Sequence, residues 1–327
     1  MFFFREVDWR ALVEAFWGAR PLPLVGVVLV TGAAYAARAW RWGDILAPLG
    51  RVGHADLLSA TVVGYAASLV VPRSGELLRP WLISRRHPIR TSAGFATIII
   101  ERLVDLVTVL VLLALCLLVL PAPASQLEGA SMELLKIGAA TAAIAAAGIL
   151  AFLLALHSKA EQMVGGLERL FARAPRWLAE PLAQLLRTFS AGLVSLRAPY
   201  PHLAKIGLQS LAVWLLTALA FHLNHMAFAI DLPFHATFVL IAFLTVGEAI
   251  PTPGLVGGFH AFYLLALSGI YGIDATIAVA AGITAHALTN LPVLAAGCAL
   301  LGREGLSLGR AIEPPQGETD SKEAGSP

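Results

Sequence analysis

Two short helix-breaking motifs interrupt long apolar stretches of this chain, and they constrain its fold more than any other feature. Pro72-Arg73-Ser74-Gly75-Glu76 ends the apolar run 57–71, and Pro251-Thr252-Pro253-Gly254 ends the run 236–250. A bilayer offers no water to backbone N–H and C=O groups, so non-helical backbone at membrane depth is tolerated only inside protein or beside a polar cavity. Paired interrupted helices in two halves of a chain are typical of transport sites.

The composition indicates a polytopic membrane protein made of α-helices. Hydrophobic residues make up 58% of the 327 residues, charged residues make up only 13%, and the mean hydropathy is +0.77. Soluble domains carry about 25% charged residues. The 23 Lys and Arg are spread over the loops, so no nucleic-acid partner is expected. Cys116 and Cys298 lie far apart in apolar segments and predict neither a disulfide framework nor a zinc site.

Apolar runs of about 20 residues predict about five full transmembrane helices. They lie near residues 22–40, 93–120, 135–156, 203–230 and 275–301. Two broken, re-entrant segments near 55–84 and 236–270 complete the predicted fold. The first membrane repeat is expected over 21–134 with its break at 72–80, and the second over 203–303 with its break at 251–258.

The remaining segments are predicted to lie outside the bilayer core. Residues 1–20 are predicted to form an interfacial helix, whose apolar side would consist of Trp9, Leu12, Val13, Phe16 and Trp17. Residues 157–202 form an amphipathic cytoplasmic linker, because apolar residues recur at three- and four-residue spacing among many arginines. Residues 313–327 are rich in Pro, Gly, Ser and charge and are predicted to be disordered.

The distribution of Lys and Arg leaves two orientations open. The loop 121–134 has no Lys or Arg and is predicted to be external under the positive-inside rule, whereas the basic linker is cytoplasmic. If 55–84 dips in from the cytoplasm, 236–270 dips in from outside and the halves are inverted repeats, with the N-terminus outside. In the alternative, 55–84 crosses fully and leaves Arg38, Arg41 and Arg51 outside. The first arrangement is favoured.

Charged residues cluster at and after the first break. Intramembrane charges are costly, so they usually pair and face an interior cavity. The substrate-binding candidates at this break are Arg73, Ser74, Gly75, Glu76 and Arg79. A guanidinium is suited to binding a phosphate bidentately.

A second charged group follows in the next apolar run. Glu101 and Asp105 are four residues apart and therefore share one helix face, with Arg102 beside them. One interpretation is an architectural network of buried ion pairs. The other makes all three residues part of the substrate site.

The second break is less charged. Its candidates are Glu248 before the break, Pro251, Pro253, Gly254, Gly257 and Gly258 within it, and His260 after it. The glycines allow close backbone approach, and free N–H groups at the start of the returning helix are suited to meeting a phosphate. Tight helix packing is the alternative interpretation of the glycines. His286 and Asn290 are possible counterparts of Glu101 and Asp105.

The other patterns in the sequence give less indication of a binding site. His222 and His225 lack a third metal ligand at helical spacing, so packing is favoured over metal binding. No ATP-binding motif occurs, and no metal or cofactor is expected. Trp40, Trp42 and Trp81 lie beside arginines and are predicted to be interfacial anchors.

The motifs together resemble a known family. Residues 71–79, the segment from Ala96-Thr97 to Glu101-Arg102-Leu103-Val104-Asp105, and residues 251–258 are similar to the flippase-like transmembrane family, the membrane domain of lysylphosphatidylglycerol synthases, which also occurs alone. The similarity runs over most of 20–303. It implies a multi-pass protein of the bacterial plasma (inner) membrane that moves a lipid between leaflets. The soluble aminoacyl-transferring domain has no counterpart here, which argues against an aminoacyl-lipid synthase.

Three function classes remain. The favoured one is a lipid translocase whose partner is a phospholipid with an anionic or phosphate headgroup, bound in a midplane cavity. The alternative is an integral membrane enzyme acting on a lipid or polyprenyl phosphate, for which the sequence offers no paired Asp-rich motif and no nucleophile beside a base. The third is a non-catalytic scaffold. No particular oligomeric state is predicted.

Overall fold

The computed structural model describes residues 9–118, 137–138, 140–155, 157–158, 198–250, 252, 254 and 256–303, and the elements among them are all helical. Three helices are long and apolar enough to cross a membrane: α2 (Pro21–Leu46), α8 (Tyr200–Ala227) and residues Ala275–Gly302 of α11 (Ala275–Arg303). The helix α5 (Thr91–Leu118) is equally long but carries three charged residues near its middle. The predicted all-helical membrane class is therefore confirmed.

The remaining helices are shorter. They are α1 (Trp9–Gly18), α3 (His54–Val70), α4 (Ser74–Ser84), α9 (Ala236–Ala249), α10 (Val256–Leu264), the π-helix η4 (Leu265–Ile270) and the apolar helix Ala140–Ala155. The predicted loop 121–134 and tail 313–327 lie outside the described residues, as does most of the linker 157–202. The predicted crossing near 22–40 ends six residues too early, because charged residues near the end of α2 are paired inside the protein.

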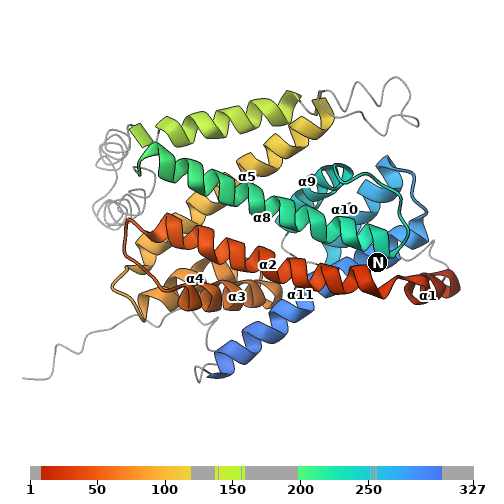
Figure 1. Cartoon of the computed structure of the whole chain (residues 1–327), viewed down its shortest axis with the longest axis horizontal. Coiled ribbons are helices and arrows are strands. Elements are labelled where there is room, and N and C mark those ends of the chain that lie inside the picture. Colours follow the sequence, from red (N-terminus) through yellow and green to blue (C-terminus); the bar gives the residue numbers. More distant parts are fainter. Residues whose placement is uncertain are drawn as a thin grey trace, which may run out of the picture.

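The helices α2 and α8 run side by side in opposite directions (Figure 1). At one end, the backbone N–H of Arg20 donates to the Ala227 carbonyl at 2.9 Å. At the other end, the Asp44 carboxylate accepts hydrogen bonds from Lys205 and Gln209 at 2.8 and 2.6 Å. The start of each helix therefore lies beside the end of the other.

Two helical hairpins enter the bundle from its opposite ends. In the first, formed by α3 and α4, Asp56 near the start of α3 accepts a 2.7 Å hydrogen bond from Arg86, just beyond α4. In the second, formed by α9, α10 and η4, the Tyr271 hydroxyl donates to the Ala236 carbonyl at 3.3 Å. The helix α5 begins at the end where the first hairpin enters, and its Cys116 reaches the His235 carbonyl at the other end, at 3.3 Å.

Each hairpin closes on a pair of glycines whose backbones touch. A Cβ atom at Gly75 would collide with the Gly64 carbonyl, and one at Gly258 would collide with the Gly247 carbonyl. In both hairpins the two glycines are eleven residues apart, and the second pair lies 183 positions after the first. Small residues at helix contacts allow this close approach.

Both breaks contain a left-handed residue. Arg73 has φ 65° at the N-terminus of α4, and Gly254 has φ 64° before α10. Glycine adopts this conformation readily, whereas a non-glycine residue held in it carries about 1–3 kcal/mol of strain and is often found at functional sites. The strained arginine therefore marks the first break as a candidate site.

Candidate functional site

The tips of the two hairpins meet inside the bundle. The Arg73 guanidinium, which follows α3, donates to the carbonyl of Ala249, the last residue of α9, at 3.4 Å. A cavity of about 300 Å³ lies at this junction, lined by Arg73 and Glu76 from the first hairpin and by Glu248 from the second. The structure thus brings together charged residues from two breaks that are far apart in sequence.

A buried cluster of four charges lies beside this cavity. Arg41 of α2 is wholly buried and donates to both oxygens of Asp105, at 2.5 and 3.1 Å, and to Glu101 at 3.0 Å. Arg79 of α4 lies 3.0 Å from the second oxygen of Glu101. Two arginines therefore neutralise two carboxylates, which is the condition under which buried charges are tolerated.

Neutral groups complete the surroundings of this cluster. Trp214 donates its indole N–H to Asp105 at 2.9 Å, and Ser210 accepts a 2.7 Å hydrogen bond from Arg41. The Arg79 guanidinium lies over the ring of Trp42, 4.3 Å from its centre. Trp42 itself is fully buried and donates to Thr97 at 3.0 Å. The prediction that Trp42 is an interfacial anchor is therefore wrong, because its ring covers a buried cation.

Arg102 lies at the edge of this cluster. Its guanidinium lies 3.9 Å from Glu101 and 4.0 Å from Asp105, and 41% of its side chain is exposed. Its one short hydrogen bond is to the Tyr65 hydroxyl, at 2.8 Å. The expected trio of residues 101, 102 and 105 is thus divided: the two carboxylates belong to the buried cluster, and the arginine lines the cavity.

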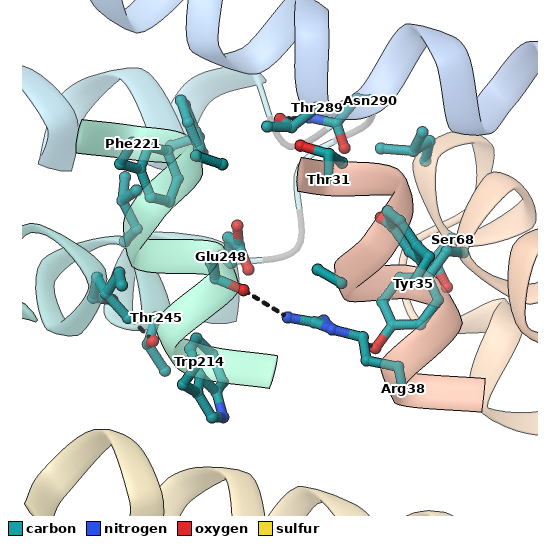
Figure 2. A pocket seen from close by; sticks show the side chains of 18 of the residues that line it. Thr31, Tyr35, Arg38, Ser68, Trp214, Phe221, Thr245, Glu248, Thr289 and Asn290 are labelled. Carbon is teal, nitrogen blue, oxygen red and sulfur yellow. Dashed lines mark hydrogen bonds between the residues drawn. The ribbon is translucent and has the colours of Figure 1, made fainter. Parts of the chain in front are cut away.

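A second cavity, of about 180 Å³, adjoins the first and shares lining residues with it, among them Tyr65, Arg102 and Glu248. Figure 2 shows Arg38 and Glu248 directed into it from opposite sides. Arg38 donates to Tyr65 at 3.4 Å and to Thr217 at 3.3 Å. Among the described residues, no hydrogen-bond donor reaches the Glu248 carboxylate.

The rest of the second break contributes histidines and backbone. His286 of α11 contacts the Gly254 carbonyl at 2.8 Å, and His260 contacts the Val256 carbonyl at 2.5 Å. The two imidazole rings lie 5.0 Å apart. Gly258 is at the hairpin crossing, and the neighbouring Gly257 is exposed. Pro251 and Pro253, which were also predicted site residues, lie outside the described residues.

At the first break, Ser74 and Gly75 form the first turn of α4. The Gly75 N–H donates to the Ser68 hydroxyl at 3.0 Å. Gly75 therefore helps to close the hairpin, and Ser68 is part of the wall of both cavities.

Arg38, Arg41 and Tyr65 are not among the site residues predicted from the sequence. All three lie in or next to apolar stretches, and the two arginines were attributed to the cytoplasmic end of a helix. Two carboxylates four residues apart inside an apolar run require cations, and the first break supplies one close partner, Arg79. This charge balance indicated that a further cation was needed, and the structure identifies it as Arg41.

Comparison with known proteins agrees with this picture. The chain is 23% identical over 332 residues to the glycosyltransferase AglD of Haloferax volcanii, an alignment that covers 94% of this chain and 53% of that protein. The chain therefore spans about half the length of this relative. Residues 1–297 match the family described as the lysylphosphatidylglycerol synthase TM region. Because the match covers most of the chain, this protein belongs to the lysylphosphatidylglycerol synthase transmembrane family.

Proposed function

We propose that this protein moves lipids with an anionic or phosphate-bearing headgroup between the leaflets of a bacterial inner membrane. The observation that carries the proposal is the meeting of the two hairpin tips at a charged cavity, with Arg73 bonded to Ala249 across the junction. A charged headgroup needs polar surroundings at membrane depth, and here they are supplied from both ends of the bundle.

The arrangement of the halves supports alternating access. The helix α2, the first hairpin and α5 occur again in the same order as α8, the second hairpin and α11. The antiparallel packing of α2 and α8 is what two inverted repeats require. In such transporters the repeats rock about a central site, and the tips of the two hairpins are suited to act as the two gates.

The residues that line the cavity have different roles in binding. The exposed Arg73 and the half-exposed Arg102 are free to meet a headgroup. Arg79 is buried against Glu101 and Trp42, so it holds the wall of the cavity instead of gripping the substrate. Glu76 and Glu248 supply the opposing negative charges.

An enzyme acting on a lipid phosphate is the second candidate, favoured by the relative that is named a glycosyltransferase. In that case the cavity carboxylates Glu76 and Glu248 would act as acid and base. The chain matches only about half of that relative, so the relative's name does not decide between the two candidates.

Proteoliposomes distinguish the candidates directly. Purified protein is reconstituted into vesicles that contain a headgroup-labelled phosphatidylglycerol, and the label on the outer leaflet is quenched by an impermeant reagent. Translocation predicts that quenching proceeds beyond the outer-leaflet half, while chromatography of the same lipids shows no new product. A new lipid product, or quenching that stops at half as in empty vesicles, would contradict the proposal.

A further inference from the structure

The charges around the cavities do not cancel. Within the buried cluster, Arg41 and Arg79 are matched by Glu101 and Asp105 at 3.1 Å or less. Arg102 reaches the same two carboxylates only at 3.9 and 4.0 Å, and Arg41 and Arg79 already contact them more closely. Arg102 is therefore a surplus cation facing the cavity.

Arg38 is a second cation of this kind. Its hydrogen bonds go to two neutral hydroxyls, those of Tyr65 and Thr217. The rings of Tyr35, Tyr65 and Trp214 surround its guanidinium, with ring centres 5.9, 5.7 and 5.5 Å away. Cation–π contacts of this kind fix the orientation of a guanidinium without neutralising its charge.

The two surplus cations converge on one hydroxyl. Arg38 and Arg102 both donate to Tyr65, at 3.4 and 2.8 Å. Because both guanidinium groups donate, the Tyr65 oxygen acts as the acceptor and its own hydrogen remains available to a third group. Two guanidinium groups and one O–H donor around a cavity are a set of donors suited to a phosphate oxygen.

Among the described residues that line the smaller cavity, Glu248 is the one carboxylate. Figure 2 shows Tyr35 and Arg38 of α2, Ser68 of α3, Trp214 of α8, and Thr289 and Asn290 of α11 around it. The same cavity is lined by Tyr65, Arg102 and Thr217. In the larger cavity, Glu248 shares the wall with four further charged residues, which are Arg73, Glu76, Arg79 and Asp105. A phosphate and an ionised Glu248 would compete for the same two cations, since like charges in one cavity repel.

We propose that Arg38, Tyr65 and Arg102 form the subsite for the headgroup phosphate, and that Glu248 takes up a proton when the phosphate binds. The lipid source of the phosphate rests on the proposed function, whereas the subsite itself does not. Arg38 and Tyr65 are thus substrate-binding residues that lie outside both helix breaks. Translocation of the lipid would then carry a proton with it.

Calorimetric titration of the detergent-purified protein tests the subsite. The probes are a soluble short-chain phosphatidylglycerol, the matching short-chain diacylglycerol, which lacks the phosphate, and inorganic phosphate. We choose a phosphodiester because its own charge does not change near neutral pH. The wild-type protein should bind the phosphodiester lipid well above the diacylglycerol. Binding of inorganic phosphate as well would support the subsite and identify free phosphate as a second source.

Single variants test which residues bind the phosphate. Arg38→Gln should weaken binding of the phosphodiester lipid about tenfold or more, because it removes a charge-assisted hydrogen bond. Tyr65→Phe keeps the ring and should weaken binding about fivefold. Glu248→Gln should strengthen binding. The control is Arg51→Gln at an exposed position outside the cavities, which should bind as the wild type does.

Proton uptake is measured by repeating the titration in buffers with different ionisation enthalpies. The wild-type protein should take up protons on binding the lipid, and Glu248→Gln should not. If folded Arg38→Gln and Tyr65→Phe bind as the wild type does, the subsite is wrong. If Arg38→Gln does not fold, Tyr65→Phe and Glu248→Gln still decide. Binding with these properties but without lipid flux in vesicles would overturn the proposed function and leave the subsite standing.

Discussion

In each half of the molecule, a buried side chain holds the helix before the hairpin to the long helix after it, but the two halves use different chemistry. In the first half, Arg41 of α2 binds two carboxylates of α5. In the second half, Asn224 of α8, which is 183 positions later, donates to the Tyr263 hydroxyl at 3.1 Å and to the Ala281 carbonyl at 3.0 Å. Arg41 and Asn224 are both fully buried. Each of them ties the helix before a hairpin to the long helix that follows it.

The second half shows that neutral groups can hold such a junction together. Neutral hydrogen bonds hold the second half, and replacing a buried ion pair by neutral groups is often neutral or stabilising in proteins. The charges of the first half therefore require another explanation than stability. Their position beside the larger cavity, which Arg79 and Asp105 help to line, links them to the binding of a charged substrate.

The largest expected effect concerns the opposite entry of the two hairpins. In a variant without Cys116 and Cys298, single cysteines are placed at Ala55 and Ala275, two exposed alanines in the first turns of α3 and α11. An impermeant thiol reagent added outside intact cells should label position 275 and leave position 55 unlabelled. Labelling of both positions, or of neither, would contradict the inverted arrangement. Labelling of position 55 alone would keep the inverted arrangement and contradict the predicted orientation.

The next prediction compares how much stability is lost when the buried side chain is removed from each half. Arg41→Ala leaves two buried carboxylates with Arg79 as their one close cation and Arg102 no nearer than 3.9 Å. It should therefore lower the free energy of unfolding by about 3–5 kcal/mol. Asn224→Ala should cost about 1–3 kcal/mol, because it leaves buried neutral groups without a partner. Thermal unfolding in detergent measures both losses.

Neutralising the two carboxylates that lose their partner provides the control for the Arg41 variant. Adding Glu101→Gln and Asp105→Asn to Arg41→Ala should restore much of the lost stability. If the restored variant also moves lipid at the parental rate, the charged cluster is dispensable, and the functional explanation for the difference between the halves fails.

The glycine crossings should respond alike in both halves. In Gly75→Ala and Gly258→Ala, the new methyl group meets the backbone of the partner helix, so each should lose about 1–3 kcal/mol of stability. Gly32→Ala and Gly207→Ala are controls, because nothing lies within 4 Å of a Cβ atom at either position. A loss in one hairpin only, measured by thermal unfolding, would show that the hairpins are not equivalent.

The smallest effect is expected from Tyr263→Phe. It removes one neutral hydrogen bond to Asn224 and keeps the packed ring, so the free energy of unfolding should fall by about 1 kcal/mol. The same thermal measurement applies. A loss as large as that of Arg41→Ala would contradict the view that the second junction is the weaker and simpler one.

The hairpins were predictable from sequence because their causes are local. Pro72 and the glycines interrupt long apolar runs, and a proline lacks the N–H that a continuing helix needs. The predicted bounds of the two broken segments, 55–84 and 236–270, therefore agree closely with those of the hairpins. The family resemblance rested on the same motifs and is confirmed by the match over residues 1–297.

The ion-pair partners within the site could not be predicted from local sequence in the same way. Arg41 lies between two tryptophans near a predicted helix end, which is the pattern of a membrane interface. Its burial depends on how α2 packs against α5, and no local pattern carries that information. The division of Arg102 from Glu101 and Asp105 is likewise a tertiary result, because all three residues fall within five positions.

Whether lipid passes between the two hairpin tips is tested most directly by joining them. In the variant without native cysteines, Arg73→Cys and Ala249→Cys are linked with a short, reducible bifunctional thiol reagent, and lipid flux in vesicles is measured before and after reduction. The account predicts that flux stops on cross-linking and returns on reduction, while each single variant is insensitive to the reagent. Undiminished flux through the cross-linked protein would contradict it.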